Sequence, residues 1–385
     1  MRKLLTIWLA VSFSLSLFSQ TATFNITSNG TNAAIDSAIE YTTNIWSQYL
    51  NSAVPIKVRI NYQSLSSAGP LGITFPNGVK NFPGTPVADV WYPYALANAI
   101  TGTELNPGEL DMEIFINSFF NMYFGTDGNP PAGVYDFVSL LLHEICHGLG
   151  FVSLAKVDVN QGSFGELTAA DFAPISPSFP FPDLEGKPSI YDVYLWEANS
   201  DSLVDTTLFP NPGTALEAAF TGNDVVIRGG DLFSNITPPK IYAPVNFALG
   251  SSISHLDEQS FPASDSNSLM TPFLSTSEVE HFPGGITLEI LSKLGWPDEI
   301  SGIKENLNSR FLFYPNPSNG RLYNRSEVNA EVFIYDLLGQ LVFQTEITSA
   351  NRDVILDLMD GIYIAELKTA NNLRLFQNIL IINDH

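Results

Sequence analysis

The chain contains very little cysteine and little positive charge. Its 385 residues include one cysteine, Cys146, so no disulfide can form within the chain. Lys and Arg number 17 against 40 Asp and Glu, which gives a formal net charge of −23. Such a charge repels nucleic acids and anionic membranes, and we expect neither as a partner. The fold must therefore be held by an apolar core, for which the 45% hydrophobic residues suffice, or by bound metal.

Long apolar runs are also missing, except near the start of the chain. Residues 1–3 are Met-Arg-Lys, and the apolar stretch 4–18 follows them directly. A charged start before a short apolar run is typical of a secretory signal peptide, which we place at residues 1–19. The run is too short for a membrane span, and no later segment is apolar enough to form one. We expect an exported protein without a transmembrane segment.

Histidine is scarce, with five residues, yet two of them stand in one short motif. Residues 141–151 read Leu-Leu-His-Glu-Ile-Cys-His-Gly-Leu-Gly-Phe. On a helix, His143 and His147 lie one turn apart on the same face, where two imidazoles can bind one zinc ion. Glu144 follows the first histidine and is placed to take a proton from a zinc-bound water. The motif and the apolar residues before it predict a buried helix that carries a zinc-hydrolase site.

A motif with three specified positions also occurs by chance in proteins that bind no metal. The zinc prediction therefore needs further ligands elsewhere in the sequence. A hydrolytic zinc ion needs a third protein ligand and one open position. His255 and His281 are the two internal candidates, and an acid such as Asp257 could also serve. Cys146 lies within the motif but beside the histidine face, and we interpret it as a small buried apolar residue.

The surroundings of His255 carry a resemblance to a known family. This histidine follows Ser254, and Met270 comes later in the sequence Leu-Met-Thr-Pro. The combination resembles the metzincin zinc peptidases of the leishmanolysin type. In these proteins a long insertion separates the HExxHxxG helix from a Ser-His ligand segment, and a Leu-Met-x-Pro turn follows. The short continuation of the motif in many other metzincins would require a histidine at position 153, which is serine here.

The resemblance implies a specific set of roles. His143, His147 and His255 would bind Zn²⁺, and Glu144 would act as the general base. Met270 would form a Met-turn beneath the metal, and a glycine after the helix would let the chain reverse. By the same resemblance, the strand at 111–117 would form the edge of a substrate cleft.

Hydrophobic periodicity predicts a mixed fold for residues 20–297. Apolar spacing indicates helices over 31–50 and 286–295, and alternation indicates strands over 54–62 and 111–117. Glycine and proline make 63–90 look like a loop. We also expect 152–250 to be irregular, with short strands. The expected fold class is α+β, a metzincin-like protease domain with a mixed sheet and an active-site helix, followed by a small β-sandwich.

The texture of the sequence changes after a polar stretch at 298–310, which we take as a linker. Residues 311–385 contain short alternating strands separated by turns, as in a small β-sandwich. The sequence Tyr-Pro-Asn-Pro-Ser-Asn-Gly at 314–320 and the sequence Gly-Ile-Tyr-Ile at 361–364 resemble the C-terminal sorting domain of the bacterial type IX secretion system. This implies passage through the outer membrane, with the secretion machinery as partner. A carbohydrate-binding or adhesive sandwich is the alternative.

Together these features predict a secreted zinc metalloendopeptidase that acts on protein or peptide substrates. One alternative is a surface adhesin or binding protein on a degenerate protease scaffold. Another is a zinc hydrolase that cleaves non-peptide amides of the cell wall. Calcium is possible as a second cofactor, although no loop shows a recognisable ligand spacing.

Overall fold

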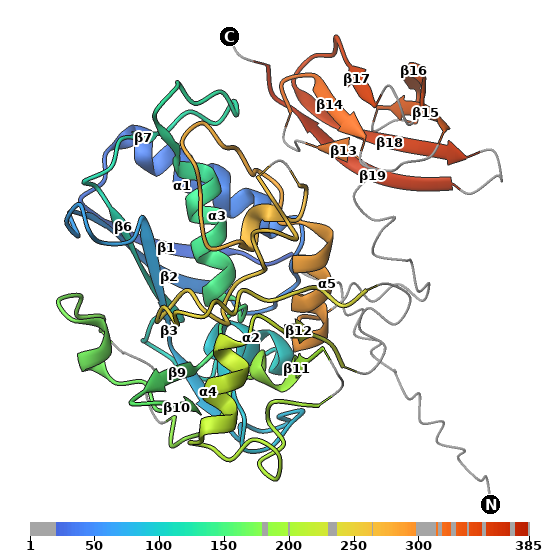
Figure 1. Cartoon of the computed structure of the whole chain (residues 1–385). Coiled ribbons are helices and arrows are strands. Elements are labelled where there is room, and N and C mark those ends of the chain that lie inside the picture. Colours follow the sequence, from blue (N-terminus) through green and yellow to red (C-terminus); the bar gives the residue numbers. More distant parts are fainter. Residues whose placement is uncertain are drawn as a thin grey trace, which may run out of the picture.

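The computed structural model describes most of the chain outside its first 20 residues. It covers residues 21–297 except 179–183, 199–200, 230–236 and 264, and residues 313–383 except 315–317, 325–328, 337–338, 349–351 and 370–373. The expected signal peptide at 1–19, the expected linker at 298–310 and His385 lie outside these residues. Helices and strands are mixed, which is compatible with the α+β class (Figure 1).

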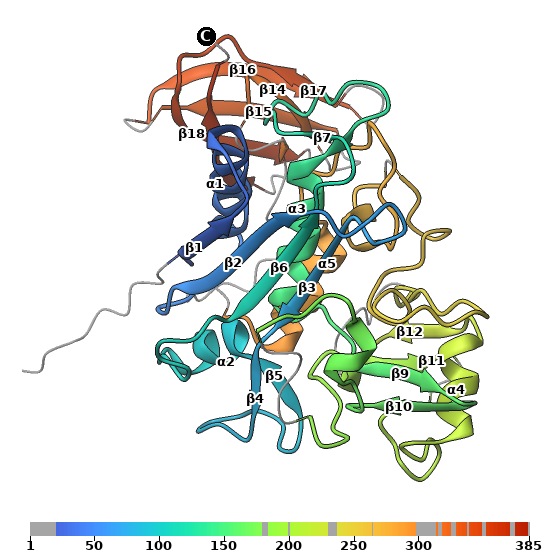
Figure 2. The same cartoon turned by 90° about the vertical axis from the view of Figure 1, so that its left-hand side faces the viewer.

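A four-stranded sheet organises the larger part of the molecule. Its order is β1 (Phe24–Asn29), β2 (Ile56–Gln63), β6 (Met112–Asn117) and β3 (Gly72–Pro76). The first three strands are parallel, and β3 runs antiparallel to β6 (Figure 2). Residues 56–60 of β2 alternate between buried and half-buried, whereas all six residues of β6 are buried. Both faces of β6 are covered, because Met112, Ile114 and Ile116 belong to the main apolar core and Phe115 belongs to a second apolar cluster.

Two helices lie side by side on one face of this sheet (Figures 1 and 2). Helix α1 (Ala33–Ser47) begins at Asn32, whose side chain accepts hydrogen bonds from two backbone N–H groups of the first turn. Helix α3 (Phe137–Gly148) begins at Asp136, whose carboxylate accepts from the Ser139 N–H. The indole of Trp46 donates to the Leu142 carbonyl at 3.2 Å and joins the two helices. The helix that carries the histidine motif is therefore packed against both the sheet and α1.

The remaining elements of this part are short. The helices are α2 (Tyr94–Thr101), α4 (Thr214–Thr221) and α5 (Gly285–Leu294), with 3₁₀ turns η1 (Ala169–Phe172), η2 (Asp192–Tyr194) and η3 (Ser268–Met270). The strands are β4 (Gly78–Lys80), β5 (Trp91–Pro93), β7 (Met122–Tyr123), β8 (Tyr135–Asp136), β9 (Ala155–Asp158), β10 (Gln161–Phe164), β11 (Leu195–Glu197) and β12 (Val225–Ile227).

Several predicted elements are confirmed within one to three residues. Helix α1 lies inside the predicted 31–50, β2 matches 54–62, and α5 matches 286–295. Gly295 ends α5 in the left-handed conformation with φ of 119°, where glycine carries no steric penalty. The region 152–250 does contain short strands, but it also contains α4, which the sequence analysis did not predict.

The strand predicted at 111–117 is present as β6, but its predicted role as the cleft edge is wrong, and so is the predicted loop at 63–90. Strand β6, at 112–117, is an interior strand, because β2 and β3 pair with its two sides. The predicted loop 63–90 instead holds β3 and β4, and β3 is the edge strand. Both strands are short and lie between prolines and glycines. These turn-forming residues predict a loop, and the few strand residues between them are too short a run to indicate a strand. Pairing with β6 stabilises β3 as a strand despite its short length.

The C-terminal residues form two further sheets with their own core. One sheet has the order β13 (Phe313–Tyr314), β14 (Arg321–Asn324), β17 (Asp353–Ile355). The other has the order β16 (Leu341–Ile347), β15 (Ala330–Tyr335), β18 (Gly361–Thr369), β19 (Arg374–Ile381). Their buried side chains form an apolar cluster that shares no residue with the cores of the larger part. This agrees with the predicted small β-sandwich.

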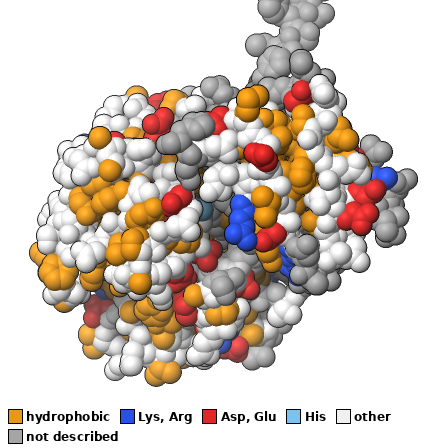
Figure 3. Space-filling view, turned by 90° about the horizontal axis from the view of Figure 1, so that it is seen from above, with side chains coloured by type: hydrophobic (Ala, Val, Ile, Leu, Met, Phe, Trp, Pro, Cys, Tyr) orange, Lys and Arg blue, Asp and Glu red, His pale blue; other side chains and the backbone are white. Residues whose placement is uncertain are grey.

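The surface agrees with the composition. Figure 3 shows Asp and Glu side chains spread over one face of the molecule, with Lys and Arg at only a few places. Among the residues that the structure describes, no helix is both long and apolar enough to cross a membrane.

Candidate metal centre

Helix α3 presents two histidines of the motif toward the same side. His143 is half-buried and His147 is buried, on consecutive turns of the helix. After the helix the chain turns at Gly150, whose φ is 122°. This glycine occupies the position that the family resemblance assigned to a turn residue. The turn brings the Phe151 carbonyl back to 2.7 Å from Nδ1 of His147.

The third histidine comes from a distant loop that is anchored on the turn η3. The backbone N–H of Leu256 donates to the Met270 carbonyl at 2.8 Å, and the Tyr242 N–H donates to the His255 carbonyl at 2.9 Å. The Leu269 carbonyl lies 2.6 Å from Nδ1 of His143. The backbone of η3 therefore contacts both His143 and the residue after His255, and it sets their separation.

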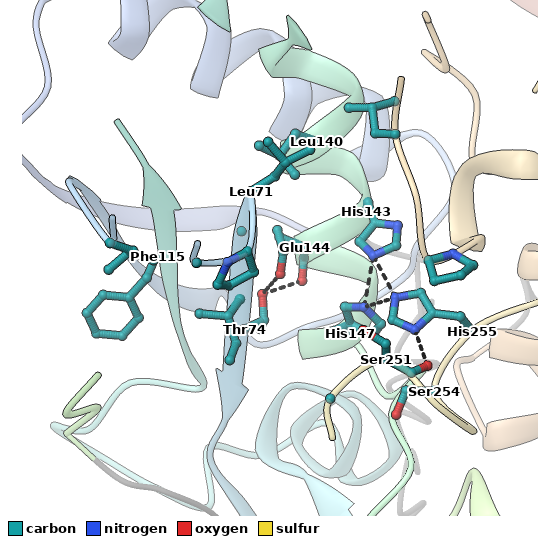
Figure 4. Close-up of a pocket in the computed structure, with 18 of the residues that line it drawn as sticks. Leu71, Thr74, Phe115, Leu140, His143, Glu144, His147, Ser251, Ser254 and His255 are labelled. Carbon is teal, nitrogen blue, oxygen red and sulfur yellow. Dashed lines mark hydrogen bonds between the residues drawn. The ribbon is translucent and has the colours of Figure 1, made fainter. Parts of the chain in front are cut away.

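The three imidazoles meet at their Nε2 atoms (Figure 4). Nε2 of His143 lies 3.0 Å from Nε2 of both His147 and His255, and the last two are 3.2 Å apart. These residues form a group of ligand atoms that could hold a metal ion. The structure thus brings together the three histidines that the resemblance selected.

Backbone carbonyls determine which nitrogen of each ring is free. Nδ1 of His143, His147 and His255 lies 2.6–2.7 Å from the carbonyls of Leu269, Phe151 and Ser251. Since a carbonyl only accepts, each Nδ1 carries the proton, and each neutral ring keeps a lone pair on Nε2. Three lone pairs then face one another with no proton between them. Such an arrangement is unfavourable unless a cation lies among them.

Burial keeps these rings neutral. Loss of contact with water lowers the pKa of His143 to about 4 and that of His147 to about 3. It also lowers the pKa of His255 well below its ordinary value, and the two neighbouring rings add to the effect. All three imidazoles are therefore neutral near pH 7, with no proton on Nε2, which is the form that binds metal.

The donor set suits zinc. Three nitrogen ligands at about 2.0–2.1 Å in a tetrahedral arrangement would lie about 3.3 Å from one another. The observed separations of 3.0–3.2 Å are close to this spacing. Three neutral histidines with one side left open are also typical of catalytic rather than structural zinc sites.

The glutamate of the motif is held by the edge strand β3. Thr74 Oγ1 lies 2.6 Å from Glu144 Oε2, toward which it donates, and 2.9 Å from the backbone carbonyl of Glu144. Gly72 approaches so closely that a Cβ atom there would lie 2.5 Å from Glu144 Oε1. Burial raises the pKa of Glu144 to about 7, and the Thr74 hydrogen bond opposes this rise. The carboxyl group can thus take up and release a proton near neutral pH.

These side chains line one large cavity of about 1390 Å³. Most of its walls come from loop 63–71 with β3, from α3, from residues 167–176, and from residues 249–255 with 268–280; Phe115 of β6 and residues around 152–155 also line it. A cavity of this size has room for several residues of a bound chain.

The competing ligand candidates lie elsewhere. Nε2 of His281 lies 2.7 Å from the Asp136 carboxylate at the start of α3. Asp257 accepts hydrogen bonds from the backbone N–H and the hydroxyl of Ser260. Cys146 is fully buried in the main core, as expected. Met270 is fully buried too, and its predicted place beneath a metal stays a prediction.

The residues that support the site were not predictable from the sequence. Thr74 and Gly72 lie in the segment 63–90, which the glycines and prolines predict to be a loop. The three carbonyls at Nδ1 belong to the backbone and do not depend on residue type. The only available signal was the alternation Gly-Ile-Thr-Phe before Pro76, which is too short to stand out.

Comparison with known proteins identifies the C-terminal part of the chain. Residues 312–382 match the family model of the secretion system C-terminal sorting domain. No curated protein matches the chain. The match agrees with the resemblance seen at 314–320 and 361–364 and with the sandwich of two sheets. These residues form a type IX sorting domain, and the protein is one that is secreted to the cell surface or the extracellular space.

Proposed function

We propose that this secreted protein is a zinc-dependent endopeptidase. The observation that carries the proposal is the convergence of three Nε2 lone pairs, each fixed by a carbonyl at Nδ1, in the cavity that Glu144 also lines. A structural role for the histidines alone would leave these lone pairs in mutual repulsion. A bound cation removes the repulsion and explains why the three rings meet.

His143, His147 and His255 would hold the zinc ion. When bound, the ion would supply Lewis acidity toward a carbonyl oxygen and would make a water molecule more acidic. Glu144 would take a proton from the water and transfer it to the departing amine, as its position beside His143 and its pKa of about 7 permit. Thr74 would hold the carboxylate in one orientation during both transfers.

The side of β3 that pairs with no other strand in the described part of the chain, which we call its free edge, would bind the substrate chain in place of the strand expected at 111–117. The Asn117 N–H donates to the Leu71 carbonyl. By the alternation of an antiparallel pair, Ile73 and Phe75 then bond to β6, while the backbone groups of Gly72 and Thr74 point to the free edge. An extended peptide could add there as a further strand. This would place it beside Glu144, which both residues contact.

Zinc content and peptide cleavage test the proposal. Purified full-length protein should contain one zinc ion per chain by elemental analysis, and His255→Ala should lose most of it. Glu144→Gln should keep the zinc and lose cleavage of a protein substrate such as casein, because the amide cannot accept the proton. A folded protein without zinc, or a Glu144→Gln variant with normal cleavage, would overturn the proposal. The first outcome would favour a binding protein on a degenerate scaffold.

A further inference from the structure

The cavity extends past β3 to the side of the sheet away from the histidines. Apolar side chains form its wall there, and we call this region the apolar lobe. Its members come from β3, β6 and the segment around η1: Ile73, Phe115, Leu167, Phe172 and Ile175. Figure 4 shows Phe115 separated from the histidines by β3.

The apolar lobe is built on a core of its own. Phe75 packs edge-to-face against Phe172 at 5.0 Å and against Phe115 at 5.9 Å between ring centroids. The residues beneath belong to an apolar cluster distinct from the main core. Ile73, Phe172 and Ile175 are only half-buried, so their surface remains available to a ligand.

Strand geometry connects this lobe to a peptide at the β3 edge. Successive side chains of a strand point to opposite faces, so Thr74 faces α3 and Ile73 faces the other side, beside Phe115. A peptide added to β3 alternates in the same way. Its residue opposite Ile73 would then point into the apolar lobe, while the residues on either side would point toward α3 and Glu144.

We propose that the apolar lobe is a specificity pocket that takes one large aliphatic or aromatic side chain of the substrate peptide. This inference rests on the proposed function, since it requires a peptide at the β3 edge. It assigns the substrate class as polypeptides with a bulky apolar residue close to the cleaved bond, on the strand face opposite Glu144.

The charges around the cavity support an apolar rather than an acidic ligand. Within the described part of the chain, the lining contains Asp171, Glu278 and Glu280 besides Glu144, and no Lys or Arg. Asp171, beside the lobe, is paired with Lys156 at 2.8 Å, so it presents little net charge. An acidic side chain would find no unpaired Lys or Arg in the described lining, because Lys156 is already paired with Asp171, whereas an apolar side chain would gain by burial.

The test uses peptides in which one position at a time is Phe, Gly or Lys. Cleavage by the full-length wild type is measured with quenched peptides, and binding of the same sequences is measured on zinc-loaded Glu144→Gln by fluorescence anisotropy. The variant Ile175→Glu places a carboxylate in the lobe. Val159→Glu is the matched control, because it adds the same charge at a residue that is 88% exposed and outside the cavity lining.

We expect one peptide position at which Phe is favoured over Gly and Lys by about tenfold or more, the scale of a hydrophobic pocket. Ile175→Glu should abolish that preference and favour Lys at the same position only, whereas Val159→Glu should behave like the wild type. A change confined to one peptide position cannot come from partial unfolding. Absence of any apolar preference, or a preference unchanged in Ile175→Glu, would overturn the inference.

Failure of the proposed function would give a different pattern. If the peptides bind but the wild type cleaves none of them, the endopeptidase proposal fails. In that case the binding measurements still test the lobe. A preference for Phe at one peptide position that is lost in Ile175→Glu would support it as the pocket for an apolar side chain. If neither binding nor cleavage is seen, both proposals are overturned.

Discussion

At the scale of single residues, hydrogen bonds fix the orientation of each imidazole and of the Glu144 carboxylate in the candidate site. Each histidine has its Nδ1 occupied by a carbonyl, so only Nε2 is free. Glu144 has one carboxylate oxygen bonded to Thr74. Groups held in this way need little rearrangement on binding a ligand, which is the usual basis of catalytic preorganisation.

Thr74 provides the sharpest prediction at this scale. Thr74→Val keeps the shape of the side chain but removes a hydrogen bond to a charged group, which is worth about 1.5–3 kcal/mol. We expect kcat to fall about ten- to a hundredfold. The acidic limb of the pH–rate profile should move to higher pH, since this bond lowers the pKa of Glu144.

The matched variant for this test is Thr74→Ser, which retains the hydroxyl and should recover most of the activity. Zinc content should be the same in wild type, Thr74→Val and Thr74→Ser, because the Thr74 hydroxyl bonds to Glu144, whereas the histidines are held by backbone carbonyls. Equal activity of the valine and serine variants would show that the hydroxyl has no role in catalysis.

At the scale of elements, the edge strand β3 and helix α3 approach each other at a glycine. Gly72→Ala would place a methyl group 2.5 Å from Glu144 Oε1. The carboxylate ends a flexible side chain and can move away, so the loss of stability should be modest, about 1–3 kcal/mol. Activity should fall far more, about 100-fold, because a displacement of about 1 Å at the reacting group is enough for such a loss.

Gly285→Ala is the control for this substitution. An added Cβ there would meet only Asn267 Oδ1, at 3.9 Å. We expect normal activity and an unchanged melting temperature in this variant. If Gly72→Ala lost stability and activity in parallel, β3 would have a structural role only.

The start of α3 depends on the buried pair of Asp136 and His281. His281→Ala removes one partner of the Asp136 carboxylate, which also accepts hydrogen bonds from the N–H and the hydroxyl of Ser139. We expect a loss of about 1–3 kcal/mol in unfolding free energy, measured by chemical denaturation. Zinc content should stay at one per chain, in contrast to His255→Ala. Loss of zinc from the folded variant would reopen the question of the third ligand.

At the scale of the whole molecule, buried carboxyl groups give the stability an uncommon pH dependence. Asp192 is fully buried and accepts hydrogen bonds from the backbone N–H groups of Leu154 and Ser189, which joins two distant segments. Burial raises its pKa from 3.8 to about 6, although these hydrogen bonds oppose the rise. The folded state therefore favours the protonated carboxyl group.

Asp192→Asn tests this effect. The wild-type contribution is fully present below about pH 4 and is lost as the pH rises through about 6. The asparagine carbonyl can accept the same hydrogen bonds and cannot ionise. The melting temperature of the variant relative to the wild type should thus increase between pH 4 and pH 7. Parallel curves for the two proteins, at equal zinc content, would contradict the predicted shift.

The sequence by itself determined the features that depend on neighbouring residues. The motif at 143–147 occupies little more than one helical turn, so its spacing already places both histidines on one face. Helices α1 and α5 and strand β2 were predictable, because each carries a full apolar period. The sorting domain was recognisable because its turns keep characteristic residues at 314–320 and 361–364.

The tertiary structure alone decided which distant groups meet. His255 is 108 residues from His147. By residue type alone, His281 was an equally good candidate for the third ligand. The backbone of η3 brings His255 to α3, whereas His281 is paired with the Asp136 carboxylate at the start of α3. Likewise, β3 becomes the edge strand only because β6 pairs with it, which also brings Thr74 to Glu144. For His255 the resemblance around the Leu-Met-Thr-Pro sequence was the available signal. The contacts of β3 and of the Nδ1 atoms depend on long-range pairing and on backbone carbonyls, which residue types do not specify.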